Sequence, residues 1–122
     1  MSPCQNIIVM AIAITSMVLL CDLTGAATIR VGGAAGWGFA MDGWQKGQTF
    51  NVGDVLEFKY DPTLHNVVVV SKEDYESCTP KGKTLNSGDD KVTLTASGTT
   101  YYICGIAAHC ASAGVKAAIT TV

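Results

Sequence analysis

Apolar and polar residues alternate in short runs along most of the chain, and Gly, Pro, Asp and Ser interrupt these runs at regular intervals. Residues 55–60, Val-Leu-Glu-Phe-Lys-Tyr, alternate between apolar and polar side chains, which predicts a strand with one buried face. Residues 67–70 are four consecutive valines, a run typical of a strand in the interior of a sandwich. On these criteria we predict strands at 28–31, 49–51, 55–60, 67–71, 91–94, 99–104 and 116–122.

Turn signals such as Gly53-Asp54 and Ser97-Gly98 separate the expected strands. Short strands that alternate regularly with turns favour an all-β fold, and we predict a Greek-key β-sandwich. The segment 72–83, with its acidic residues, is where the sequence allows one short helix.

The amino-terminal part of the chain has a different character. Residues 7–20 are almost wholly apolar, and small residues follow at 24–27. This pattern predicts a secretory signal peptide over residues 1–26, because the apolar stretch is too short to span a membrane. A signal anchor or a buried amino-terminal helix is the alternative, which the flanking small residues disfavour. We therefore expect a secreted, extracellular or cell-wall protein whose single domain covers residues 27–122.

Composition and charge narrow the class of protein. The chain carries eight basic and ten acidic residues, a net charge of −2 at pH 7, and Asp22 lies within the predicted signal peptide. A nearly neutral domain does not favour binding to nucleic acid or to an anionic membrane. Since the sequence ends at Val122 in the last expected strand, we expect no glycolipid anchor. We also expect the protein to be a monomer.

Cysteine usage points to both a disulfide and a ligand. Cleavage after Ala26 leaves Cys78, Cys104 and Cys110, and an odd number in a secreted protein needs an explanation. The odd number is explained if two cysteines form a disulfide and the third binds a metal. Cys104 has the spacing of a ligand, so we predict the disulfide Cys78–Cys110. A small domain gains about 2–5 kcal/mol from such a bond.

The chain contains only two histidines, His65 and His109. His109 follows Cys104 by five positions, and His65 stands just before the valine run. One thiolate and two imidazoles form the trigonal ligand set that proteins use for copper in electron transfer. A single cysteine or histidine is more often an ordinary packing residue, but the spacing and the odd cysteine coincide here. We predict that His65, Cys104 and His109 bind one copper ion.

Several blocks of sequence occur in the order found in one plant family. The chain resembles the phytocyanins, the plant blue-copper proteins, and most closely their plantacyanin (basic blue protein) subgroup. The resemblance covers nearly all residues after 26, and it implies a cupredoxin-like sandwich, the same disulfide, and copper that alternates between Cu(I) and Cu(II). The subgroup is typically basic and this chain is not. The matching blocks are 31–33, 36–37, 44–47, 53–54, 61–70 and 102–116.

The chain departs from this family at the fourth ligand position. The resemblance implies Met or Gln as a weak axial ligand five residues after the second His, where Gly114 stands here. A loop one residue longer would align Val115 with that position, and neither side chain can donate to copper. A backbone carbonyl near Gly114 stays possible, and Met41, in a loop, has no family precedent as a ligand. We predict a non-donor Val115 at the axial position and a raised reduction potential.

The resemblance also implies a role for Asn66, whose backbone N–H would point at the Cys104 sulfur and raise the potential. The apolar residues 106–108, between two ligands, are candidates for the surface on which an electron partner docks. For the aromatic residues Trp37, Trp44 and Phe50 we favour plain packing in the sandwich.

A one-electron carrier, with an unknown protein or small molecule as redox partner and no enzymatic activity, is the function that this ligand set favours. The alternative is an extracellular cell-wall interaction or signalling protein in which copper redox chemistry is secondary. A zinc hydrolase is a third possibility, but residues 103–122 contain no Asp or Glu to serve as general base.

Overall fold

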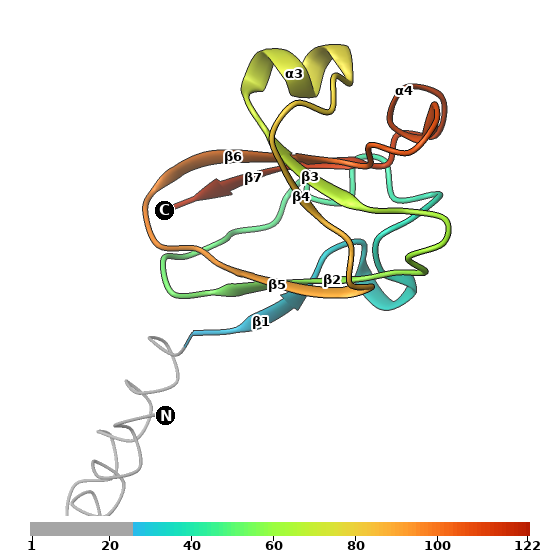
Figure 1. Cartoon of the computed structure of the whole chain (residues 1–122). Coiled ribbons are helices and arrows are strands. Elements are labelled where there is room, and N and C mark those ends of the chain that lie inside the picture. Colours follow the sequence, from blue (N-terminus) through green and yellow to red (C-terminus); the bar gives the residue numbers. More distant parts are fainter. Residues whose placement is uncertain (1–25) are drawn as a thin grey trace, which may run out of the picture.

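Two β-sheets face each other in the computed structural model, which describes residues 26–122 (Figure 1). Strand order is β1-β2-β5 in the three-stranded sheet and β4-β3-β6-β7 in the four-stranded sheet. Strands β1 and β2 pair in parallel and all the other paired strands are antiparallel. The strands are β1 (Thr28–Arg30), β2 (Val55–Lys59), β3 (Val67–Val70), β4 (Lys83–Leu85), β5 (Asp89–Thr93), β6 (Gly98–Ile103) and β7 (Lys116–Thr121).

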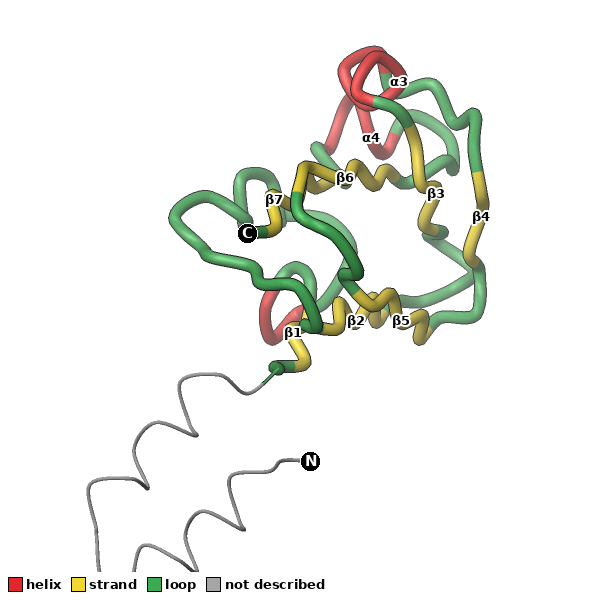
Figure 2. The backbone as a smooth tube through the Cα atoms, turned by 90° about the vertical axis from the view of Figure 1, so that its left-hand side faces the viewer, coloured by secondary structure: helices red, strands yellow, loops and turns green. Residues whose placement is uncertain are grey.

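Helices are short, and the two in the second half of the chain lie on the outer side of the four-stranded sheet (Figure 2). The helices are η2 (Gly33–Ala35), α3 (Lys72–Ser77) and α4 (His109–Ala113). Helix α3 directly follows β3, and the Ser71 hydroxyl caps it by accepting the N–H of Asp74 at 3.2 Å. Acidic side chains in its first turn also favour the positive end of the helix.

The core fills the space between the sheets. Leu56 and Phe58 on β2 are fully buried while Lys59 is exposed, so the alternation seen in the sequence does produce one buried face. The Phe58 ring contacts Trp37 edge-on at 5.2 Å and Tyr102 at 5.1 Å between ring centroids. These aromatic contacts join the two sheets.

A buried carboxylate fixes the start of the domain. Asp54 is only 4 % exposed, and its two oxygens accept the N–H groups of Ala27 and Asn51, each at 2.9 Å. The N–H of Val55 in turn donates to the Ala27 carbonyl at 2.8 Å. The first strand is therefore attached to β2 at its first residues.

The disulfide Cys78–Cys110 joins the end of α3 to α4 with a Cα–Cα distance of 5.7 Å, which confirms the predicted pairing. Cys110 is buried against Val68 and Ile103. The disulfide therefore attaches both helices to the outer face of the four-stranded sheet.

Other predictions need correction. The strand expected at 49–51 does not form, because Phe50 makes only an isolated bridge with Thr121. Strand β4 and helix α4 were not expected, and the helix allowed in 72–83 covers only Lys72–Ser77. The predicted signal peptide lies outside the described residues except for Ala26. Within residues 26–122, no helix is long and apolar enough to cross a membrane.

Candidate metal centre

Three segments bring the predicted ligands to one end of the sandwich. His65 lies in the loop before β3, Cys104 directly follows β6, and His109 is the first residue of α4. Strands β3 and β6 are antiparallel neighbours with Val68 opposite Ile103. The start of β3 and the end of β6 therefore lie side by side, which places His65 next to Cys104.

The donor atoms have the spacing of a metal site. The Cys104 Sγ lies 3.6 Å from Nδ1 of His65 and 3.8 Å from Nδ1 of His109, and the three donor atoms lie within 4.8 Å of one another. Metal bonds of about 2.0 Å to nitrogen and about 2.3 Å to sulfur, set about 120° apart, would separate sulfur from nitrogen by about 3.7 Å. The three residues fit a trigonal copper ion.

Burial and charge suit these side chains to bind a metal. Cys104 is 1 % exposed and His65 is 4 % exposed, whereas His109 is half-buried. Burial lowers the pKa of His65, the nearby His109 lowers it further, and Asp61 partly opposes them. A lowered pKa keeps the imidazole neutral at neutral pH, so its nitrogen lone pair is available to a metal.

Helix α4 and the turn after it return the chain from His109 to the core. Gly114 ends the helix at a φ of 65°, and the N–H of Val115 donates to the His109 carbonyl at 3.1 Å. A Cβ at Gly114 would lie 2.9 Å from the Cβ of Asp42. Glycine is therefore required both by the backbone angle and by the close approach of Asp42.

Val115, the residue predicted at the axial position, is fully buried in the same core cluster as Cys104. Its carbonyl accepts the N–H of Cys104, and the Gly114 carbonyl accepts the N–H of Lys116, both at 2.9 Å. Both carbonyls thus already have a hydrogen-bond donor. That Val115 faces the metal stays a prediction.

Met41 is buried in the loop between β1 and β2. It is 4 % exposed, and its sulfur accepts the backbone N–H of Gly38 at 3.4 Å. The thioether therefore holds its own loop, and the expectation that Met41 is no copper ligand stays a prediction.

Asn66 connects two loops of the site. Its side-chain oxygen accepts the N–H of Gly105 at 2.6 Å, and its carbonyl accepts the indole N–H of Trp37 at 2.9 Å. The first bond joins the residues that follow His65 and Cys104, and the second attaches Trp37 to Asn66. A hydrogen bond from the Asn66 N–H to the Cys104 sulfur remains a prediction.

The apolar surface beside the ligands differs in part from the one expected at 106–108. Ile106 packs against the core, while Ala107 and Ala108 are exposed. The largest exposed apolar side chains near the ligand loops are Phe39, at 50 %, and Leu64, at 47 %. Sequence reasoning missed Phe39, since the loop between β1 and β2 has no spacing that ties it to the ligands. Of the aromatic residues expected to pack, Trp37 and Phe50 are buried and Trp44 is partly buried.

Tyr60 links the two sheets just before the loop that carries His65. Its hydroxyl donates to the carboxylate of Asp90 on β5 and lies 3.2 Å from the Leu85 carbonyl on β4. Burial, with the Asp90 contact second, raises the pKa of Tyr60 to about 12. The hydroxyl therefore stays protonated and keeps this link at neutral pH.

Comparison with known proteins agrees with this geometry. The family model of a plastocyanin-like domain matches residues 37–114. Chemocyanin of Lilium longiflorum is 41 % identical over 118 residues, which cover 95 % of this chain and 92 % of the relative. A basic blue protein of Arabidopsis thaliana is 43 % identical over 117 residues, covering 94 % of this chain and 89 % of the relative.

Solved structures are similar in fold as well as in sequence. Cucumber basic protein, a blue copper protein, is 41 % identical and superimposes with a TM-score of 0.72, covering 78 % of this chain and 99 % of the other. Spinach plantacyanin is also 41 % identical, with a TM-score of 0.65, and the match covers 80 % of this chain and 100 % of the other. These neighbours agree with the cupredoxin-like fold expected from the sequence.

Proposed function

The chain belongs to the phytocyanins, a family of blue copper proteins, and from that premise we propose that it is a secreted one-electron carrier whose copper site lacks a Met or Gln axial ligand. One copper ion is the cofactor that its His-Cys-His cluster and its family imply. The proposal includes the absence of enzymatic activity, a monomeric state and a redox partner that is a protein or a small molecule.

One observation carries the proposal. Within the described residues, Cys104 is the one cysteine outside a disulfide, and it is buried between two imidazole nitrogens. A buried thiol in such a place gains nothing from packing that a small apolar residue would not also supply. A thiolate ligand explains its position.

Bound copper supplies a one-electron change between Cu(I) and Cu(II). The chain supplies a nearly rigid frame, because each ligand loop is tied to a neighbour: Gly105 to Asn66, Cys104 to Val115, and α4 to α3 through the disulfide. Ligands that move little between the two oxidation states keep the reorganisation energy of electron transfer small.

Exposure differs between the two histidines and suggests where electrons pass. His65 is 4 % exposed, whereas His109 is half-buried. We therefore assign the path of the electron to His109, and the approach of a redox partner to this end of the molecule.

The residues near the axial position support the proposed absence of a Met or Gln donor. Val115 is fully buried beside Cys104, its side chain has no donor atom, and Met41 sulfur already accepts a backbone N–H. An axial donor stabilises Cu(II) more than Cu(I), so its absence favours the reduced state. The reduction potential is therefore expected to lie above that of a Gln-ligated site.

A visible absorption spectrum tests the function. The chain beginning at Ala27, loaded with Cu(II), is expected to show an intense band toward the red end of the visible range from charge transfer between thiolate and copper. Cys104→Ser is expected to abolish the band while circular dichroism retains the β-sandwich signature. Val52→Ala, a change at a surface valine that is 51 % exposed, is the control that keeps the band.

A colourless Cu(II) complex of the unaltered protein would contradict the electron-carrier function. It would favour the alternative, an extracellular interaction protein in which copper redox chemistry is secondary.

A further inference from the structure

Three aromatic rings meet at the outer side of the metal centre. The Phe39 ring lies 4.7 Å from the ring of His65 and 4.9 Å from that of His109, and the two imidazoles lie 5.1 Å apart, all between centroids. Each pair meets edge to face, at interplanar angles of 70°, 74° and 63°. One phenyl ring therefore contacts both histidine ligands.

The loop that carries Phe39 is anchored on both sides. Trp37 is 2 % exposed, and its indole and backbone N–H groups donate to the carbonyls of Asn66 and Lys59. Met41 is 4 % exposed and holds the Gly38 N–H through its sulfur. Buried residues two positions before and two positions after Phe39 thus fix where its ring can lie.

Backbone conformation points to the same conclusion. Ala40 adopts a φ of 67°, a left-handed conformation that residues other than glycine rarely adopt. Such strain persists only where the surroundings hold it in place, and here it sits between Phe39 and the Met41 anchor. The turn fixes the direction in which the chain presents the phenyl ring.

Phe39 is a large apolar residue that lies partly exposed beside the two histidine ligands. Half of this large apolar side chain, 50 %, faces solvent, although the rest of the loop is well anchored. The phenyl ring contacts both imidazoles.

We propose that Phe39 is a positioning residue that holds both imidazoles against rotation and thereby slows the release of copper; this inference rests on the proposed copper function. In both histidines Nδ1 faces the Cys104 sulfur, so a ligand can leave the metal only if its ring turns or its loop moves. The phenyl ring occupies the space into which either imidazole would turn. It also covers part of each ring from water.

Proton NMR of the metal-free protein tests the contact without copper. The chain has only two histidines, so their ring protons can be assigned from His65 and His109 single variants. Phe39→Ala removes the ring current of one phenyl group, and it is expected to shift the ring protons of both histidines. Val52→Ala, matched in exposure at 51 %, is expected to shift neither.

Copper extraction tests the consequence. Loss of the blue band is followed after adding excess EDTA to the Cu(II) protein. Phe39→Ala is expected to lose copper about tenfold faster than the unaltered protein, the factor that the loss of two aromatic contacts implies. Phe39→Tyr keeps the ring and is expected to restore the slow rate. Phe39→Leu keeps apolar bulk without a flat ring and is expected to lie between them.

The controls separate this role from general stability. Metal-free Phe39→Ala loses the same two aromatic contacts and is expected to unfold at a lower temperature than Val52→Ala, so Phe39→Leu, which keeps apolar bulk, is the variant that separates the ring contact from packing. If Phe39→Ala does not fold, Phe39→Leu decides, because a packing role predicts that its extraction rate equals that of the unaltered protein.

Equal extraction rates for Phe39→Ala and Val52→Ala in a blue protein would overturn the proposal and leave the electron-carrier function intact. Unchanged chemical shifts of the histidine ring protons in Phe39→Ala would also overturn the proposal. A colourless unaltered protein would instead refute the proposed function, whatever the NMR result.

Discussion

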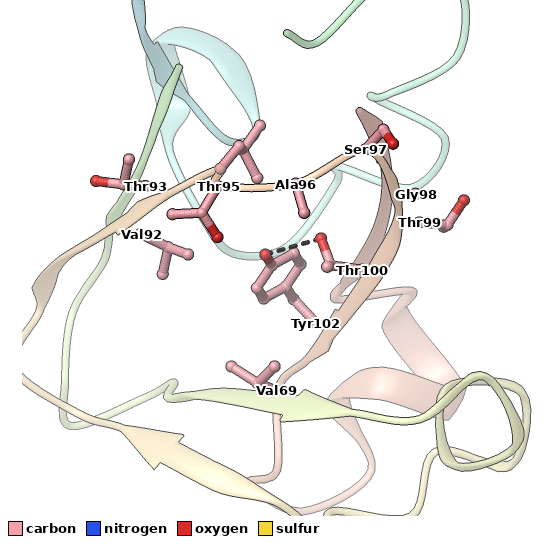
Figure 3. Close-up of a pocket in the computed structure, with 11 residues that line it drawn as sticks. Val69, Val92, Thr93, Thr95, Ala96, Ser97, Gly98, Thr99, Thr100 and Tyr102 are labelled. Carbon is pink, nitrogen blue, oxygen red and sulfur yellow. Dashed lines mark hydrogen bonds between the residues drawn. The ribbon is translucent and has the colours of Figure 1, made fainter. Parts of the chain in front are cut away.

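Strand β6 connects two very different ends of the molecule. Its first three residues, 98–100, are exposed, whereas Tyr102 and Ile103 are buried and lead directly into the ligand Cys104. At the exposed end a cavity of about 280 Å³ opens between the sheets, lined mainly by the residues around the β5–β6 connection, including Thr95, Thr100 and Tyr102 (Figure 3).

The two ends differ in how the chain is held. At the ligand end, a disulfide, the two hydrogen bonds to Asn66 and the glycine turn at 114 tie four segments together. At the cavity end, the hydrogen bond drawn between lining side chains, from the Tyr102 hydroxyl to Thr100 at 2.9 Å, stays within strand β6 (Figure 3). The disulfide and the bonds to Asn66 join the ligand loops directly, and changes at the two ends should therefore have unequal effects on copper binding.

Removing the disulfide should have the largest effect. Cys78→Ala with Cys110→Ala is expected to lower the free energy of unfolding by about 2–5 kcal/mol, since the bond closes a separation of 32 residues. Because Cys110 follows His109, copper should also be lost faster. Urea unfolding of the metal-free protein and EDTA extraction measure the two effects. Both cysteines must be replaced, since a single leftover thiol could pair with Cys104. Unchanged extraction would show that α4 holds His109 without the disulfide.

The turn after α4 gives a sharper test, because the chain contains a matched glycine. Gly114 and Gly47 have similar φ angles, 65° and 77°, but a Cβ meets Asp42 at 2.9 Å only at Gly114, and nothing within 4 Å at Gly47. Gly47→Ala should cost about 1 kcal/mol for the backbone angle, and Gly114→Ala about 1–3 kcal/mol more for the clash. Gly114→Ala should also broaden or shift the blue band. Equal losses in urea unfolding would mean that Asp42 moves aside freely.

Substitutions at Val115 test how the ligand end sets the reduction potential of copper. If this residue faces the metal, Val115→Met should lower the reduction potential, and Val115→Gln should lower it further, because a better axial donor stabilises Cu(II). Voltammetry of the three proteins at one pH measures this. If neither substitution changes the reduction potential, Val115 lies away from the metal, and a backbone carbonyl is the better candidate for the axial ligand.

At the cavity end we expect the smallest effect. Tyr102→Phe removes the hydrogen bond to Thr100, whose hydroxyl is exposed and can bond to water instead, so the loss should be at most about 1 kcal/mol in urea unfolding. The blue band should not move, although Tyr102 lies only two residues before Cys104. A shifted band would show that the two ends are coupled through β6.

Much of the molecule could be predicted from local pattern. The alternating run in β2 and the valine run in β3 each form the expected strand. Alternation in the sequence indicates one buried face, and a continuous apolar run indicates two. The odd cysteine count led to the pairing of Cys78 with Cys110, since the ligand spacing set Cys104 apart.

The errors come from features that only tertiary contacts decide. Strand β4 is three residues long, Lys-Thr-Leu, and it forms because β3 offers a partner along Val67–Val69. Helix α4 has no side-chain cap at Ala108, so its start carries no sequence signal. Phe39 reaches the ligands through the anchors Trp37 and Met41, and the apolar pattern of that loop says nothing of which ring it touches.

Asp54 has a practical consequence for making the protein. Its Oδ1 lies 2.9 Å from the Ala27 nitrogen, which is an amide in the full chain. If cleavage follows Ala26, as the sequence predicts, that same nitrogen becomes an ammonium group, and the buried carboxylate acquires an opposite charge. A recombinant chain with even one extra residue before Ala27 keeps the amide and moves the positive charge away. Stability measured on such a tagged chain would then understate that of the naturally processed protein.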